Sequence, residues 1–174
     1  MLRRTAAVIA LVAISTLTEA PVAAKVAMTS LAELARRADF IGIVRVDRIG
    51  VRVPLVRRPR ATATVLDNWR GQADGRVNFV AAPTWICDIS DAKRGEEIVV
   101  FIRGDRLLHA GRGRMPIFTR DNRKLAAIWP EVALPAGVNT EDGPEPEYRF
   151  IRAVDVSDLR DAIAKLASAS SITR

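Results

Sequence analysis

The chain has 174 residues, of which 27 are lysine or arginine and 20 are aspartate or glutamate, so its formal net charge is +7 at pH 7. This length is enough for one domain with a sizeable core. The single cysteine excludes an intramolecular disulfide, so stability must come from packing. The basic balance favours anionic partners, because guanidinium groups bind carboxylates and phosphates in pairs of hydrogen bonds. The alternative explanation for the high arginine content is genomic base composition, which implies no anionic partner.

The first 24 residues have the pattern of a secretory signal peptide. Arg3 and Arg4 form a basic start, and residues 6–17 are apolar apart from one serine and one threonine. That run is well short of the ~20 residues that span a bilayer, and no cysteine follows it for lipid attachment. We expect cleavage after Ala24 and a single exported domain at 25–174, periplasmic or secreted, with no membrane span.

A short helix is predicted at the start of this domain. Ser30 and Glu33 form a capping box, in which the serine hydroxyl accepts a backbone N–H and the glutamate reaches back. Leu31, Leu34 and Ala35 follow at helical spacing and form one apolar face.

Three strands are predicted next, at 40–53, 60–69 and 77–81. In the first, Val44 and Val46 alternate with polar residues, but the later apolar residues have the opposite phase. A slip of one residue predicts a β-bulge near Asp47-Arg48.

The second half of the chain continues in strands. The uninterrupted apolar run at 98–102 predicts a central strand buried on both faces. Residues 107–110 are expected to pair with it as a hairpin, and residues 111–114 (GRGR) to form a flexible basic loop. Two further strands are predicted at 115–119 and 125–129.

The C-terminal part is predicted to be a loop followed by a helix. Residues 135–147 are rich in proline, glycine and acidic residues. Ser157 is the expected cap of a helix that packs Leu159, Ile163 and Leu166 on the body. Together these elements predict a mainly β fold, a small antiparallel OB-like barrel with short N- and C-terminal helices.

Four segments carry a family resemblance: residues 31–46, residues 61–71, Cys87, and the run GEEIVVFI at 95–102. In this order they resemble bacterial exported proteins of the netrin-like, TIMP-like group, over roughly residues 30–110. The resemblance implies an OB-fold barrel. TIMP-type inhibitors bind the zinc of a metalloprotease through an N-terminal cysteine, whereas the mature chain here would begin at Lys25 and lacks the group's disulfides. The resemblance therefore implies a fold and no activity.

Two arginine clusters are the main candidates for a functional site, one at 45–60 and one at 103–124. If both reach one face, they form an anion-binding groove in which tryptophans stack on the ligand. The predicted ligand-binding residues are Arg45, Arg48, Arg52, Arg112, Arg114 and Trp85. Outside the cytoplasm this favours an anionic polymer, lipid headgroups or an acidic envelope protein over nucleic acid. The competing interpretation is a solvated strand edge whose charges discourage pairing.

The main prediction is thus an exported, non-enzymatic binding domain. One alternative is a thiol-dependent enzyme in which His109 and Asp88 activate Cys87, provided that the three meet in space. Another is a subunit of an envelope complex, with the acidic segment 141–147 docking a partner. One cysteine and one histidine lack the spacing of a metal site, so neither a metal nor a cofactor is expected.

Overall fold

The computed structural model describes residues 27–50, 59–81, 91–145 and 150–171. The predicted signal peptide, Arg52, Trp85, Cys87 and Asp88 lie outside the described residues. The elements, in chain order, are β1 (Thr29–Ser30), α1 (Leu31–Arg37), β2 (Phe40–Ile49), β3 (Arg60–Arg70), β4 (Arg76–Val80), β5 (Glu97–Arg103), β6 (Arg106–Leu107), β7 (Arg114–Arg120), β8 (Arg123–Ile128), β9 (Val132–Ala133), β10 (Glu141–Glu145), β11 (Phe150–Asp155) and α2 (Val156–Ser171).

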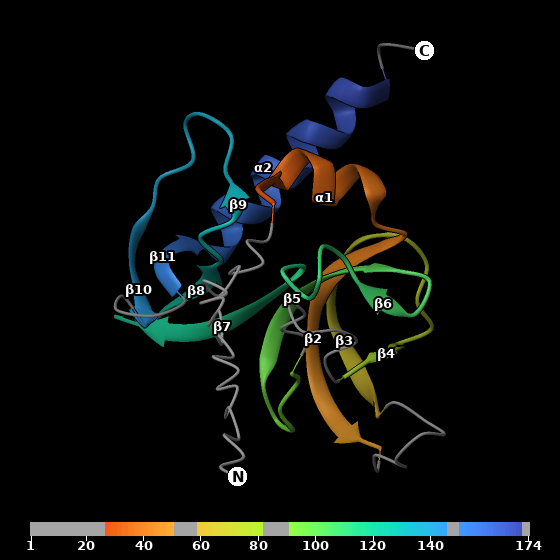
Figure 1. The fold of residues 1–174 in the computed structure, drawn as a ribbon. Coiled ribbons are helices and arrows are strands. Elements are labelled where there is room, and N and C mark those ends of the chain that lie inside the picture. The colour runs from red at the N-terminus through yellow and green to blue at the C-terminus, as the bar shows by residue number, and fades with distance from the viewer. Residues whose placement is uncertain (1–26, 51–58, 82–90, 146–149, 172–174) are drawn as a thin grey trace, which may run out of the picture.

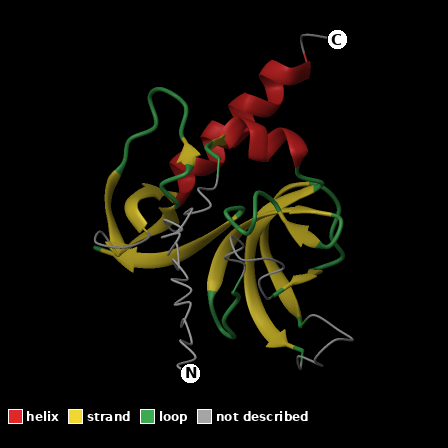
Figure 2. Cartoon of the chain, in the orientation of Figure 1, coloured by secondary structure: helices red, strands yellow, loops and turns green. Residues whose placement is uncertain are grey.

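Nine of these strands form one antiparallel sheet in the order β10-β11-β8-β7-β5-β2-β3-β4, with β6 paired beside β5 (Figure 1). The two helices lie against each other at one end of the strands (Figure 2). The mainly β, antiparallel fold with a helix near each end of the described chain agrees with the prediction. The sheet of the described residues is open, because β4 and β10 are its two edges and do not pair with each other.

Strand β7 joins the two halves of this sheet. Its first residues, 114–116, pair with β5, whereas residues 117–120 pair with β8. The β7–β8 hairpin closes through Asp121 and Asn122, both with positive φ (50° and 60°), which is the two-residue turn that suits the twist of a hairpin. The halves are therefore β2–β6 on one side and β7, β8, β10 and β11 on the other (Figure 1).

Strands β2 and β5 separate two apolar cores. Ile41 and Phe101, which are cross-strand partners, face a core closed by both helices, β8 and β11. Val44 and Ile98, also partners, face a second core closed by β3 and β4. Residues 98–102 are at most 3% exposed, so the prediction of a central strand buried on both faces is confirmed.

The predicted β-bulge in β2 is also confirmed. The pairing of β2 with β3 shifts between Val46 and Arg48, which leaves Asp47 as the extra residue. The bulge turns Asp47 and Arg48 towards the same side of the sheet, because Thr64 donates to Asp47 and Arg48 is the partner of Thr62. This local geometry sets up the polar face described below.

Two predictions on short segments are wrong in part. The hairpin predicted after residues 98–102 forms, but only Arg106 and Leu107 pair with β5, so the strand expected at 107–110 ends early. The expected loop at 135–147 contains β10, which pairs with β11 although its residues are acidic, glycine and proline. Gly143 permits this pairing, because a Cβ at that position would lie 2.0 Å from the carbonyl oxygen of Phe150.

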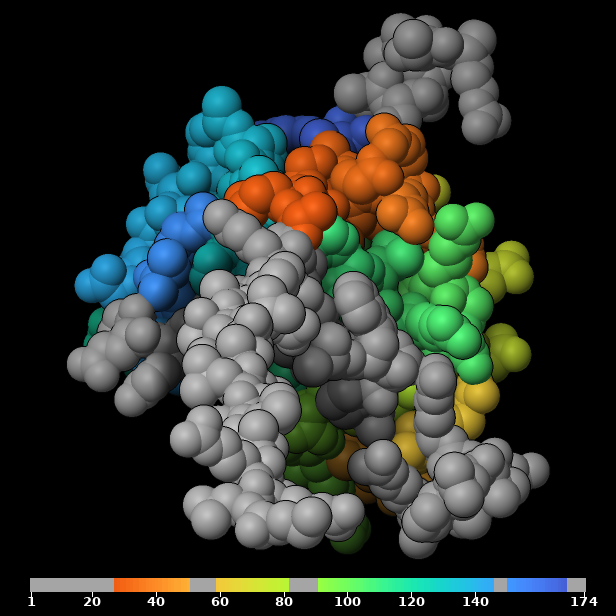
Figure 3. All heavy atoms as spheres, in the orientation of Figure 1, coloured from red at the N-terminus to blue at the C-terminus, as the bar shows by residue number. Residues whose placement is uncertain are grey.

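The start of the described chain is held against the body. Ser30 caps α1, since its hydroxyl accepts the N–H of Glu33 at 3.0 Å, as the capping box predicts. β1 pairs in parallel with β9. In the space-filling view the red-orange start of the described chain lies between the cyan segment of β9 and the green segment that precedes β7 (Figure 3).

The cap of α2 is Asp155 rather than the predicted Ser157. The backbone N–H and the hydroxyl of Ser157 both donate to one carboxylate oxygen of Asp155, at 2.9 and 2.6 Å. An ionised carboxylate one residue before the helix accepts these N–H and O–H groups better than a second hydroxyl would. The predicted packing residues Leu159 and Ile163 are buried.

Replacing Asp155 with alanine is expected to lower the free energy of unfolding by about 1 kcal/mol at neutral pH. The hydrogen bonds from Ser157, the hydroxyl first, hold the pKa of Asp155 below its ordinary value of 3.8. A carboxyl whose pKa is lower in the folded state stabilises at pH above the unfolded value and loses that contribution as the pH falls through the folded value. Urea unfolding should therefore separate the two proteins at pH 6 and show a shrinking difference below pH 4. Asp158→Ala, a change in the first turn of α2, is the control.

Candidate anion-binding face

The expected basic loop at 111–114 is not exposed. Arg112 and Arg114 are only 7% and 6% exposed. Glu96 accepts two hydrogen bonds from the Arg114 guanidinium, one from Nε at 3.0 Å and one from Nη2. Arg112 donates to Glu131 at 3.4 Å, and its guanidinium lies 5.9 Å from the ring centroid of Trp129. These two arginines therefore make intramolecular contacts in the interior and are not accessible to a ligand.

Glycine explains why this segment folds inward. Gly111 has a positive φ of 83°, a conformation that other residues adopt at a cost. A Cβ at Gly113 would lie 2.9 Å from the carbonyl oxygen of Phe101, so the chain runs unusually close to β5 there. The GRGR pattern predicts a flexible loop, but its glycines permit a close approach to β5 and its arginines pair with partly buried glutamates.

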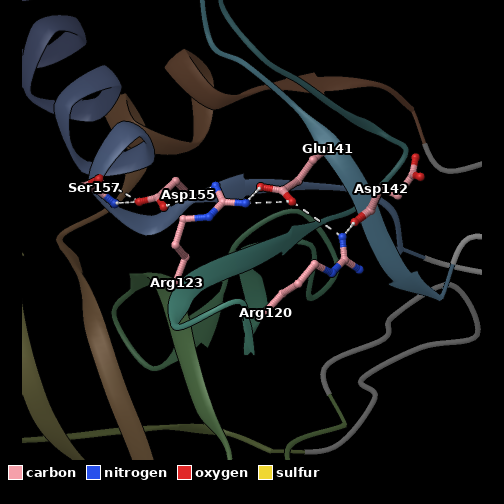
Figure 4. A network of polar contacts seen from close by, with 6 residues as sticks. All are labelled: Arg120, Arg123, Glu141, Asp142, Asp155 and Ser157. Carbon is pink, nitrogen blue, oxygen red and sulfur yellow. Dashed lines mark hydrogen bonds and ion pairs between the residues drawn. The ribbon is translucent and has the colours of Figure 1, made fainter.

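Arg120 and Arg123 of the second cluster contact acidic residues of β10 and β11 (Figure 4). Arg123 lies 3.0 Å from Glu141 and 3.9 Å from Asp155. Arg120 donates to the backbone carbonyl of Asp142 at 2.8 Å and lies 3.6 Å from Glu141. The basic hairpin and the start of the acidic segment, each expected to bind an outside partner, thus contact each other.

A different set of cations shares one face of the other half-sheet. Arg45 of β2 pairs with Thr64 of β3, and Thr64 pairs with Arg76 of β4. In the next row, Arg48 pairs with Thr62, and Thr62 pairs with Asn78. Paired residues, and residues two apart on a strand, point to the same side of a sheet. We call this surface the basic sheet face; it consists of Arg45, Arg48, Thr62, Thr64, Arg76 and Asn78.

The charges on this face are only partly balanced. Asp47 lies 3.7 Å from Arg45 and accepts the Thr64 hydroxyl at 2.6 Å. Arg48 and Arg76 are exposed, and neither has an ion-pair partner among the residues that the structure describes. Because neighbouring strands are ~4.8 Å apart, Arg45 and Arg76 lie about 10 Å apart at their backbones. The face therefore presents guanidinium groups and hydroxyls across three strands.

Arg45 and Arg48 are the predicted site residues that the structure brings together. Arg76 was missed, because it stands alone in the sequence and belongs to no cluster. The sequence pattern that could have identified it is the alternation in the third predicted strand. Arg76 and Asn78 alternate with the buried Phe79, so they point to the opposite, exposed side of the sheet. The alternation in β3 likewise puts Thr62 and Thr64 opposite the buried Ala61 and Ala63.

His109 is the one member of the predicted thiol site within the described residues. It has a positive φ of 51°, and its ring Nε2 lies 2.6 Å from the backbone carbonyl of Ala27. Because a carbonyl only accepts, Nε2 must carry the proton in this contact. His109 thus fastens the start of the described chain, and no observation favours a catalytic role.

Comparison with known proteins gives no further assignment: no protein-family model matches the chain, and no curated protein or solved structure is significantly similar to it. No helix of the described ranges is long and apolar enough to cross a membrane. The same ranges hold no cluster of three or more histidine, cysteine or acidic side chains that could bind a metal ion.

Proposed function

We propose that this protein is an exported, non-enzymatic binding domain that engages an anionic polymer through the basic sheet face. The observation that carries the proposal is the alignment of Arg45, Arg48 and Arg76 on one surface. Two of these three arginines have no carboxylate partner within the described ranges. Guanidinium groups and hydroxyls in this arrangement donate many hydrogen bonds to carboxylate, sulfate or phosphate groups.

Four arginines of the second cluster are less suited to an outside ligand, because each already contacts a carboxylate. Arg112 and Arg114 are buried against Glu131 and Glu96. Arg120 and Arg123 are held by Glu141. A ligand would have to displace these intramolecular carboxylates, whereas Arg48 and Arg76 have no carboxylate to be displaced within the part of the chain that the structure describes. An extended face suits a polymer with several charges better than a single small anion.

Export and the OB-like fold belong to the same proposal. Export rests on the signal-peptide pattern of residues 1–24. The relation to the netrin-like, TIMP-like group rests on the motifs quoted above. Support for the OB-like arrangement comes from the antiparallel order of β2 to β5 and from the bulge that bends β2. Binding on the face of the central strands is common in OB folds.

The test is elution from immobilised heparin in a salt gradient. Replacing Arg45, Arg48 and Arg76 with serine should move elution to clearly lower salt, because fewer counterions are released when fewer cations meet the polymer. The matched control replaces Arg103, Arg106 and Lys165, which are also exposed, and removes the same charge. The control should elute close to the wild type. Equal shifts for both variants would mean that net charge alone, and not this face, governs binding.

A further inference from the structure

A groove of about 350 Å³ lies between the two helices and the end of β3. Its walls come from three elements that are distant in sequence, with Ala35 from α1, Trp69 and Arg70 from β3, and Arg160, Ala164 and Ala167 from α2. This volume is within the range of natural small-molecule sites, which are commonly about 300–1,000 Å³. The groove is separate from the basic sheet face, since the two share no residue.

The walls of the groove are mostly apolar and consist of small alanine side chains and one large indole ring. Alanine at positions 35, 164 and 167 leaves space that a longer side chain would fill. Trp69 supplies a broad aromatic surface, and its indole N–H donates to Asp67 at 2.8 Å. This hydrogen bond satisfies the one polar atom of the indole and restrains the ring. An apolar chain could therefore lie against Trp69 without leaving a polar group unpaired.

The rim of the groove is cationic. Arg160 is neutralised by Asp67, at 3.1 Å. Arg70 donates to the backbone carbonyl of Ala35 and has no carboxylate partner among the described residues. A guanidinium has five N–H donors in a fixed fork, so this one contact leaves donors that match a carboxylate. The groove thus combines an apolar floor with an unneutralised guanidinium at its edge.

From this combination we infer that the groove binds a small amphiphilic carboxylate, such as a medium-chain acyl carboxylate. The carboxylate accepts hydrogen bonds from Arg70. The acyl chain lies along Ala164, Ala167 and the indole of Trp69. The ligand needs both its acyl chain and its carboxylate. Burial of the chain supplies the affinity, and the hydrogen bonds from the Arg70 guanidinium fix the orientation of the ligand in the groove.

Octanoate is the probe for this inference. In a two-dimensional ¹H–¹⁵N spectrum of the full-length mature protein, the indole N–H signal of Trp69, assigned with a Trp69→Phe variant, should shift saturably with octanoate. Octanol, which lacks the charge, and acetate, which lacks the chain, should each bind at least ten-fold more weakly. Absence of a saturable shift with octanoate, or equal binding of octanol, would overturn the inference.

Variants separate this site from the anion-binding face. Arg70→Gln and Ala164→Leu should each weaken octanoate binding about ten-fold or more. Ala164 is exposed on α2, so leucine there fills the groove without entering the core. The Arg48→Ser/Arg76→Ser variant should bind octanoate like the wild type. Unchanged octanoate binding in both groove variants would overturn the inference and leave the heparin result unaffected.

Discussion

Replacing Glu96 with alanine is expected to lower the free energy of unfolding by about 3–5 kcal/mol. Glu96 is the partner of Arg114 in a two-point ion pair, and the two side chains are only 14% and 7% exposed. The variant leaves the Arg114 guanidinium in the interior without its counter-charge. Glu96 also accepts the backbone N–H of Lys93 at 2.8 Å, so the turn that precedes β5 loses a contact as well.

The neighbouring glutamate provides a matched control. Glu97 pairs with Lys124 at 2.7 Å, but these side chains are 32% and 54% exposed. Ion pairs in contact with water contribute little, so Glu97→Ala should cost less than about 1 kcal/mol. Urea unfolding measures both variants, with the m-value checked for constancy. Similar costs for the two substitutions would contradict a structural role for the buried pair.

Gly42→Ala should be the most damaging conservative change in β2, with a cost of about 3 kcal/mol. A Cβ at Gly42 would lie 2.4 Å from the carbonyl oxygen of Asp67. The pairing of β2 with β3 is irregular around this position, with register shifts between Ile41 and Gly42 and between Ile43 and Val44. Relief of the clash requires β2 and β3 to separate, which would disturb both cores.

Gly50→Ala tests whether the close backbone approach at Gly42 causes the loss of stability expected for Gly42→Ala. Gly50 lies just after the same strand, and a Cβ there would be 3.5 Å from its nearest neighbour, the carbonyl oxygen of Arg60. This is an ordinary van der Waals distance, so the change should alter stability by no more than about 0.5 kcal/mol. Thermal or urea unfolding of the two variants gives the comparison. Equal effects would show that the clash at Gly42 relaxes at little cost.

Local patterns in the sequence predicted much of the fold. The phase slip in residues 40–53 marked the bulge at Asp47, because the period of a strand is two and one extra residue reverses it. The apolar run at 98–102 marked the central strand. The capping box marked the start of α1. In each case the physical cause lies within a few residues of its effect.

The predictions that proved wrong depended on contacts between distant residues. The burial of Arg112 and Arg114 depends on Glu131 and Glu96, and nothing near the GRGR motif indicates those partners. β10 forms from a proline- and glycine-containing segment because β11 offers an edge. A composition that favours a loop is therefore overridden by pairing that only the three-dimensional arrangement supplies.

Only part of the candidate site could be predicted, because some of its residues are close in the sequence and others are brought together only by strand pairing. Arg45 and Arg48 stand close together in the sequence and share a face through the bulge. Arg76 joins them only through the register of β3 with both neighbouring strands. Arg52 and Trp85, the other predicted ligand-binding residues, lie outside the described residues and stay predictions.

The most direct test of the anion-binding face is to map where a polyanion contacts the protein. Amide chemical shifts would be followed while a short sulfated heparin oligosaccharide is added. The proposal predicts saturable shifts at Arg45, Thr62, Thr64, Arg76 and Asn78, with little change in the hairpin of β7 and β8. Shifts concentrated at Arg120, Arg123 and β10, or no saturable shifts on β2, β3 and β4, would contradict it.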